Sequence, residues 1–248
     1  MKKLFLLAFA SISLISCQFQ ETMVLNEDGT GRMSLSMDLS EMMAFSGEFG
    51  KDSTMTKQDT IITFKDIFEE KKDSIAKLTK AEQKKLKAME NYKIRIMADP
   101  DEEKMLMDVF TDFKDVAEAN ELMRGYQQAE GFIPGADSSG SEENGEEDEP
   151  EPEIMAVAYE FKNNVFKRDA YIIDEVAHKR QVDSMKQAEA FMSSMKYKIK
   201  YTFPRRIKKT SVEDATFSLD GKTMELERSF LDYFKNPDVL DVQVELEN

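Results

Sequence analysis

The feature that most constrains the fold is an alternation of apolar and polar side chains with a period of two. It recurs in the segments 33–39, 92–96, 105–109, 155–161, 197–203 and 240–246. Successive side chains of a β-strand point to opposite faces, so this period predicts strands with one buried face and one wet face. Antiparallel sheets accommodate such strands, because one of their faces can meet water.

Turn-forming sequences separate several of the predicted strands. Asn26 to Gly31, Asp99-Pro100-Asp101, Asn163-Asn164 and Asp220-Gly221 each lie between two alternating segments. Asparagine tolerates positive φ, and a glycine or aspartate at such positions is typical of hairpin turns. We therefore expect hairpins over 22–39, 92–109, 155–170 and 215–226. The lysines of 196–200 and the acids of 241–247 would attract one another if their strands were neighbours.

Helices are predicted between the hairpins. Their expected ranges are 63–78, 80–91, 113–130, 175–193 and 230–235, and Thr79, Asp112, Asp174 and Ser229 are the expected N-caps of the last four. A Ser, Thr or Asp side chain at this position accepts a hydrogen bond from an otherwise unpaired backbone amide. The combination predicts an α+β fold, with a mainly antiparallel sheet built from hairpins and helices packed on one face.

The first residues have the features of a secretory signal. Lys2 and Lys3 precede a short apolar segment that ends at Ser16-Cys17. A dozen apolar residues are too few to span a bilayer, so residues 1–16 are predicted to be a cleaved signal peptide. Leu14-Ile15-Ser16-Cys17 resembles the lipobox of bacterial lipoproteins, which implies lipidation of Cys17 by a diacylglyceryl group and acyl chains such as palmitate. The alternative is an ordinary signal peptide that contains a cysteine.

Cys17 is the only cysteine, so no disulfide can form within the chain and stability must come from a packed core. The segment 131–153 combines Gly, Pro and Ser with acids and is predicted to be a disordered acidic linker. It lies between an N-terminal part, 17–130, and a C-terminal part, 154–248. We favour one composite α+β domain, because the N-terminal part looks too small to close alone. The linker lacks the spacing of a calcium loop.

The formal net charge is −15 at pH 7, and loss of Lys2 and Lys3 with the signal peptide would make it two units more negative. Nucleic-acid phosphates require clustered lysine and arginine, so this balance argues against a nucleic-acid partner. It also argues against a second docking surface for anionic lipid.

The residues offer little for catalysis. The single histidine, His178, lies within a predicted helix beside Lys179 and Arg180, which favours a solvated or partly packed side chain over a triad member. Helical spacing gives it only acids as neighbouring zinc ligands. A pair of carboxylates could still perform hydrolysis, but 49 acids give no means to choose one. We therefore name no catalytic, cofactor or metal residue.

Seventeen methionines remain to be explained. Pairs such as Met42-Met43, Met105 with Met107 and Met192 with Met195 could line an adaptable apolar groove. The simpler interpretation is that they belong to the core, since Met33 and Met37 lie on the apolar side of a predicted strand. No Met-x-x-Met series indicates capture of a soft metal.

Two segments have recognisable motifs: the first hairpin around residues 26–31, and Tyr201-Thr202-Phe203-Pro204 followed by the hairpin 215–224. Both resemble segments of the LppM-like exported lipoproteins. The resemblance covers about a quarter of the chain and implies an exported, membrane-anchored α+β module. The composition and the Leu-Ile-Ser-Cys site are also similar to uncharacterised lipoproteins of Bacteroidota. In that group, acids just after the cysteine accompany surface display, and Gln18 to Glu21 offers only one.

We expect a lipoprotein held in the outer membrane by Cys17, facing the periplasm rather than the cell surface. Its predicted function is that of a non-catalytic interaction or accessory subunit in the cell envelope, with an envelope protein as partner. A module that binds a lipid or another apolar ligand is the alternative. A carboxylate-pair hydrolase is a third, less favoured hypothesis.

Overall fold

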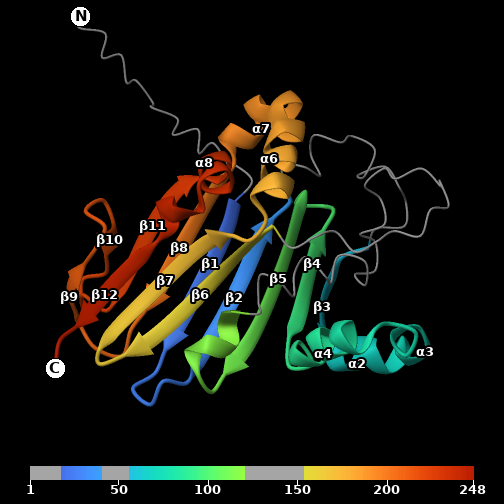
Figure 1. Ribbon diagram of the computed structural model, residues 1–248, viewed down its shortest axis with the longest axis horizontal. Helices are drawn as coiled ribbons and strands as arrows, with labels where there is room; N and C mark the ends of the chain where they lie inside the picture. Colours follow the sequence, from blue (N-terminus) through green and yellow to red (C-terminus); the bar gives the residue numbers. More distant parts are fainter. Residues whose placement is uncertain (1–17, 41–55, 121–153) are drawn as a thin grey trace, which may run out of the picture.

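The computed structural model describes residues 18–40, 56–120 and 154–248. It confirms the α+β class with mainly antiparallel strands, but it divides the strands between two sheets, where the sequence predicted one. The larger sheet has eight strands in the order β10-β11-β8-β1-β2-β5-β4-β3, and the smaller has four in the order β6-β7-β12-β9 (Figure 1).

The strands of the larger sheet are β1 (Gln18–Leu25), β2 (Gly31–Asp38), β3 (Gln58–Thr63), β4 (Lys93–Asp99), β5 (Lys104–Phe113), β8 (Lys196–Thr202), β10 (Thr216–Phe217) and β11 (Thr223–Ser229). Those of the smaller sheet are β6 (Met155–Lys162), β7 (Val165–Ile172), β9 (Ile207–Thr210) and β12 (Val242–Leu246). All four predicted hairpins are present, as β1-β2, β4-β5, β6-β7 and β10-β11.

The turn of the β6-β7 hairpin shows why asparagine stands there. Asn163 and Asn164 have φ values of 53° and 62°, the left-handed conformation that asparagine tolerates better than most residues. Two consecutive residues of this kind give a turn whose twist matches that of the flanking strands.

One strand pair joins the two halves of the chain. β1 pairs with β2 in antiparallel fashion on one side and with β8 in parallel fashion on the other, from Gln18 opposite Lys196 to Val24 opposite Thr202. The remaining neighbours in both sheets pair antiparallel. The centre of the larger sheet therefore combines the first described residues with a strand almost 180 residues later. The acidic segment 131–153 lies outside the described residues.

The inner face of the larger sheet holds the core. The smaller sheet packs on this face around β1 and β8, and α2, α3 and α4 lie at the β3-β4 edge (Figure 1). The helical elements are α2 (Phe64–Glu70), α3 (Lys72–Ile75), α4 (Lys80–Ala88), η1 (Val116–Asn120), α6 (Glu175–Ser184), η3 (Met185–Ala188), α7 (Glu189–Ser194), α8 (Phe230–Lys235) and η4 (Pro237–Leu240). Aromatic side chains fill the space between the sheets: the Phe166 ring lies 5.3 Å from those of both Tyr201 and Phe203.

The predicted caps have mixed outcomes. Asp174 caps α6 by accepting from the amides of Val176 and Ala177, and Ser229 caps α8 by accepting from the amide of Asp232. Asp112 is not a cap, because β5 continues through it to Phe113 and pairs with β2 along its length. The predicted helix 113–130 is reduced to η1 within the described residues, which stop at 120.

Three further predictions need correction. The segment 58–63, for which no strand was predicted, is β3, and the helix predicted over 63–78 is divided at Lys71 into α2 and α3. The helix predicted over 175–193 is divided into α6, η3 and α7. The lysines of β8 do not face the acids of β12, because those strands belong to different sheets; they face Glu225 and Glu227 of β11.

Most methionines within the described residues are core residues. Met23, Met33, Met37, Met89, Met195 and Met224 are buried. Met105 and Met107 are partly buried at the start of β5. Met42 and Met43 lie outside the described residues, so a methionine groove that includes them stays a prediction.

Candidate functional site

The described elements leave one face of the larger sheet open, on the side opposite the smaller sheet (Figure 1). We use "outer face" for the side chains that alternate with the buried ones on β3, β4, β5, β2, β1, β8 and β11. They follow from the strand registers, in which residues such as Thr22, Ser34 and Lys200 are cross-strand neighbours and are only partly buried. Antiparallel sheets commonly leave one face to solvent or to a partner.

Charges on the outer face balance, unlike those of the whole chain. Its basic residues are Arg32, Lys93, Arg95, Lys104, Lys196, Lys198 and Lys200, and its acidic residues are Asp38, Asp59, Asp99, Asp108, Asp112, Glu225 and Glu227. Several form cross-strand pairs, including Lys198 with Glu225 at 2.6 Å. The overall charge of −15 therefore does not prevent this face from meeting another protein surface.

Ion pairs flank a small uncharged patch on this face. On one side, Lys200 Nζ lies 2.9 Å from Glu225, and on the other Arg95 donates two hydrogen bonds of 2.7 Å to Asp59. The patch consists of the amide and hydroxyl side chains at mid-length of β1 and β2, namely Gln20, Thr22, Ser34 and Ser36. Charged residues border it, with Arg32 and Asp38 toward the two ends of β2 and Asp108 opposite Ser36 on β5. Such a patch exposes polar groups whose desolvation is far less costly than that of unpaired charges.

A shallow hollow of about 270 Å³ lies on the outer face. Its lining includes Gln20, Ser36, Arg95, Met97, Leu106 and Asp108. Asp108 accepts a 2.9 Å hydrogen bond from Ser36, and burial raises the pKa of its carboxyl above the ordinary value despite that bond. The Arg95 guanidinium in the same hollow is paired with Asp59. The third charged residue of the lining, Asp38, accepts a 3.0 Å hydrogen bond from the amide of Ser40, so all three charged groups of the hollow have partners within the protein.

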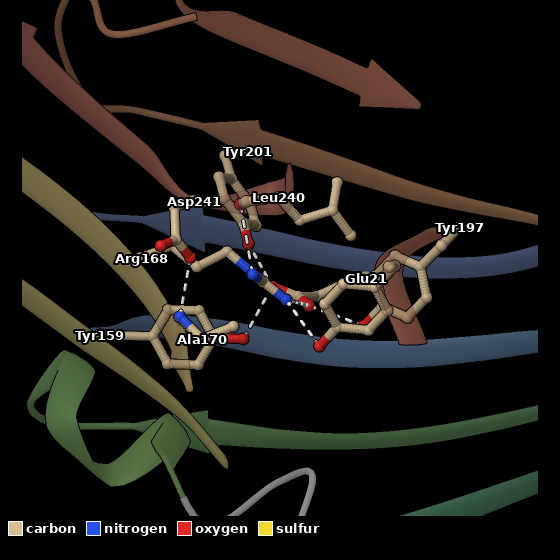
Figure 2. A network of polar contacts seen from close by, with 9 residues as sticks. Glu21, Tyr159, Arg168, Ala170, Tyr197, Tyr201, Leu240 and Asp241 are labelled. Atoms are coloured by element: carbon tan, nitrogen blue, oxygen red, sulfur yellow. Dashed lines mark hydrogen bonds and ion pairs between the residues drawn. The ribbon is translucent and has the colours of Figure 1, made fainter. Parts of the chain in front are cut away.

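A second polar feature lies inside the molecule, between the two sheets. Glu21 of β1 and Arg168 of β7 are fully buried and form a salt bridge, surrounded by Tyr159, Tyr197 and Tyr201 (Figure 2). Tyr233 also contacts the Arg168 guanidinium. We call these six residues the inter-sheet cluster. They come from β1, β6, β7, β8 and α8, so the cluster connects both sheets and the last α-helix.

The carboxylate of Glu21 is the centre of this cluster. Its Oε1 accepts from Arg168 Nε at 3.1 Å, from the Tyr159 hydroxyl at 2.7 Å and from the Tyr201 hydroxyl. Its Oε2 accepts from Arg168 Nη2 at 3.1 Å and from the Tyr197 hydroxyl at 2.8 Å. Five donors therefore occupy the lone pairs of one carboxylate, which leaves it no vacant position for a ligand.

The guanidinium of Arg168 is satisfied in a similar way. Nη1 donates to the Leu240 carbonyl at 3.2 Å, and Nη2 also reaches the Tyr233 hydroxyl at 3.3 Å. Its carbon lies 5.5 Å from the centroid of the Tyr233 ring, close enough for a cation–π contact. Next to it on β7, the amide of Ala170 donates to Asp241 at 2.8 Å, which ties β7 to the start of β12 (Figure 2).

The charge of Arg168 and the surrounding hydrogen bonds keep the Glu21 carboxyl ionised. Burial alone would raise the pKa of Glu21, but the charge of Arg168 and hydrogen bonds from the guanidinium and two tyrosines lower it below its ordinary value. Burial, followed by the charge of Glu21, raises the pKa of Tyr159, Tyr197 and Tyr201 well above the ordinary value. The tyrosines are therefore neutral donors at physiological pH, and none is an activated nucleophile.

His178 is buried on α6 rather than solvated. Its Nε2 lies 2.7 Å from the carbonyl oxygen of Phe234, and the two rings are 5.5 Å apart. The ring nitrogen next to that carbonyl must carry a proton to donate to it. The contact joins α6 to α8, so of the two predicted states, solvated or partly packed, the structure shows the packed one.

The predicted lipidation site, Cys17, lies outside the described residues, and Gln18 directly after it begins β1. The inter-sheet cluster was not predicted, although the sequence contains a signal for it. Glu21 occupies an inward position of β1 between Phe19 and Met23, and Arg168 lies between Phe166 and Ala170 on the inward side of β7. Opposite charges at apolar positions of two strands indicate a buried pair.

Within the described residues, no three His, Cys, Asp or Glu side chains are grouped so that they could hold a metal ion. A search of the same residues for a helix with the length and apolarity to cross a membrane finds none.

Comparison with known proteins gives one weak similarity. Neither the protein-family models nor the curated proteins include a match to this chain. The folded domain of LppM from Mycobacterium tuberculosis, solved by NMR, aligns over 94% of this chain and 91% of its own, with 8% sequence identity and a TM-score of 0.40. A TM-score this low does not establish a common fold. The resemblance to lipoproteins of Bacteroidota stays a prediction.

Proposed function

We propose that this chain is a lipoprotein of the bacterial cell envelope, anchored through Cys17, whose α+β domain is a non-catalytic interaction or accessory subunit. The observation that carries the proposal is the open, charge-balanced outer face on a sheet whose central strand begins directly after Cys17. A partner protein in the same envelope fits such a face, because paired charges and neutral polar groups cost less to desolvate than unpaired charges.

The buried position of Glu21 supports the periplasmic side of the outer membrane. Glu21 is the only acid among the four residues after Cys17, and its carboxylate is buried in the inter-sheet cluster, where it is paired with Arg168. No carboxylate among Gln18 to Glu21 is therefore available as an exposed acidic signal for surface display.

The anchor is tested by metabolic labelling of cells with an alkyne analogue of palmitate. We expect the label on the wild-type chain and its loss in Cys17→Ser. Labelling that is equal in the two proteins would contradict lipidation at Cys17.

The partner is tested by crosslinking in intact cells that express the tagged protein, followed by mass spectrometry of the proteins and lipids recovered with it. We expect one reproducible envelope protein. Ser34→Arg places a bulky charge at the centre of the outer face and should remove that partner. The matched control is Gln243→Arg, which is exposed on β12 of the smaller sheet and should retain it.

Two outcomes would contradict an accessory subunit that uses the outer face. Crosslinking that recovers no protein but a stoichiometric lipid would favour the apolar-ligand module instead. A partner that is retained by Ser34→Arg and lost in Gln243→Arg would place the interface on the smaller sheet.

A further inference from the structure

The distance between the proposed lipid anchor and the folded domain is very short. β1 pairs with β8 from its first residue, Gln18 opposite Lys196, and Cys17 is the residue before it. Consecutive Cα atoms are about 3.8 Å apart. If Cys17 carries the lipid, the end of the sheet where β1 begins therefore lies at the membrane surface, with no spacer to hold it away.

One strand of the smaller sheet, β7, runs toward this same end. Phe166 near the start of β7 packs on Phe203 beyond the far end of β8, whereas Arg168 meets Glu21 near the start of β1. β7 therefore runs toward the anchored end as it approaches Ile172. Figure 1 shows α6, which follows β7, beside α7 and α8 at the end where β1 begins.

Contacts between aromatic side chains fix this group of helices to β1. Phe230 of α8 stacks on Phe19 with ring centroids 4.5 Å apart, and Phe19 is the second described residue of the chain. His178 of α6 in turn bonds to the carbonyl of Phe234 on α8. The contact of Phe19 with α8 and the contact of α8 with His178 therefore fix the position of α6 relative to the start of β1.

Three apolar or aromatic side chains are exposed where β7 leads into α6. They are Tyr171, Ile173 and Val176, and Val176 is 68% exposed. Between Ile173 and Val176 lie Asp174, whose carboxylate caps α6, and the exposed Glu175; Lys179 and Arg180 follow one turn later on α6 and are also exposed. An exposed apolar group with a tyrosine and adjacent cations is the composition of a surface that rests in the interfacial region of a bilayer.

Resting on the proposed lipid anchor, we propose that Tyr171, Ile173 and Val176 form a membrane tip that inserts into the headgroup region of the bilayer that holds Cys17. Lys179 and Arg180 lie next to lipid phosphates in this orientation. The net charge of the chain argued against a second docking surface for anionic lipid. The tip refines that conclusion, because its contact with the bilayer depends on local apolar groups and on the tether, and not on the charge of the whole chain.

The opposite end of the molecule supplies an internal control. Leu219 is fully exposed, at 105%, in the turn between β10 and β11. That turn lies beyond Thr223, which pairs with Thr202 at the end of β8 remote from Lys196. Exposure alone therefore does not mark a membrane contact, and the orientation set by the anchor predicts different environments for Val176 and Leu219.

The test uses the intact lipoprotein. Lipidation would consume the only native thiol, so Val176→Cys and Leu219→Cys each introduce a single free thiol for the fluorophore NBD. The mass of each purified protein is measured first, and the proteins are then reconstituted into vesicles of phosphatidylethanolamine and phosphatidylglycerol. We expect the label at 176 to shift to shorter emission wavelength and to lose most of its quenching by aqueous iodide. The label at 219 should remain fully quenched.

The outcomes separate the tip from the proposed function. A lipidated protein whose label at 176 is quenched as strongly as the label at 219 overturns the tip alone. A mass that contains no lipid overturns the lipoprotein assignment, and the tip with it. A second variant, Val176→Glu, places a charge at an exposed position without altering the core, and it should weaken the protection of a label at Ile173→Cys.

Discussion

Two arginine–carboxylate pairs in this molecule have the same geometry and opposite surroundings. Arg168 and Glu21 form a two-pronged pair of 3.1 Å contacts with both side chains at 0% exposure. Arg32 and Asp112 form the same arrangement at 2.6 and 3.0 Å with side chains 55% and 58% exposed. If one member of the surface pair is removed, water can hydrate the other. A member of the buried pair that is left alone has no such access to water. The surroundings, and not the contact distances, set what each pair contributes.

The largest expected effect comes from breaking the buried pair. Glu21→Gln leaves the Arg168 guanidinium buried without its counter-charge and should lower the free energy of unfolding by about 3–5 kcal/mol. Asp112→Asn, the matched change on the surface, should lower it by less than about 1 kcal/mol. Urea denaturation of both variants at neutral pH measures the difference. Equal losses would show that the geometry of the pair outweighs its surroundings.

Removal of both buried charges sharpens the same comparison. Glu21→Gln combined with Arg168→Met should cost less than the sum of the single changes, with a coupling of about 3 kcal/mol, because no unpaired charge remains. The corresponding cycle with Arg32→Ala and Asp112→Ala should give a coupling of about 0.2–1 kcal/mol. A buried coupling as small as the surface coupling would contradict the assignment of Glu21 and Arg168 as an ion pair.

The pH dependence of Glu21→Gln follows from the lowered pKa of Glu21. In the folded protein this carboxyl stays ionised below its ordinary pKa of 4.5, so its stabilisation is present above that value and is lost as the pH falls through the folded pKa. The difference in stability between wild type and Glu21→Gln should therefore be greatest at neutral pH and shrink in acid. A difference that grows in acid would contradict the direction of the shift.

Removal of a neutral buried hydrogen bond should lower the free energy of unfolding by less than removal of one member of the buried ion pair. His178→Phe removes the donor to the Phe234 carbonyl while it keeps an aromatic ring on α6, and we expect a loss of about 1–3 kcal/mol. Lys179→Ala, on the exposed side of the same helix, should change stability little. Thermal unfolding of both variants is sufficient, and equal behaviour would mean that the His178 contact contributes nothing measurable.

The smallest effect has the opposite sign. Burial raises the pKa of Asp108, so the folded state disfavours its charge and stability falls as the pH rises through that pKa. Asp108→Asn should therefore stabilise the protein at neutral pH, by only a few tenths of a kcal/mol because the side chain is partly screened by solvent. The gain should vanish in acid, where Asp108 of the wild type is protonated. Destabilisation at neutral pH would show that the Ser36 contact outweighs desolvation.

Short-range signals in the sequence predicted the hairpins. The arrangement of those hairpins into sheets depends on long-range contacts and was not predicted. Alternation together with a turn, as at Asn163-Asn164, determines two adjacent strands locally. The parallel pairing of β1 with β8 and the division into two sheets depend on contacts across most of the chain, for which alternation carries no information. Asp112 illustrates the limit: its cap chemistry is correct for a helix, but pairing with β2 extends the strand through it.

The candidate site was less predictable than the fold. Glu21 was counted only as an acid near the cysteine, although its place between Phe19 and Met23 put it on the inward side of a strand. The outer face requires knowledge of which strands are neighbours. Balance of charge across it is a property of the assembled sheet, and no single segment of the sequence displays it.

The pairing of β1 has a mechanical consequence. If Cys17 carries the proposed lipid, a force applied through that anchor would enter the domain at Gln18, the first residue of β1, which has a hydrogen-bonded strand on each side. Such a load stretches both ladders in shear, so their hydrogen bonds resist together instead of opening one after another. Glu21, three residues further along, adds five hydrogen bonds that would have to break in the same step. The proposed tether would thus pull on a strand that is held by two ladders and by a buried ion pair.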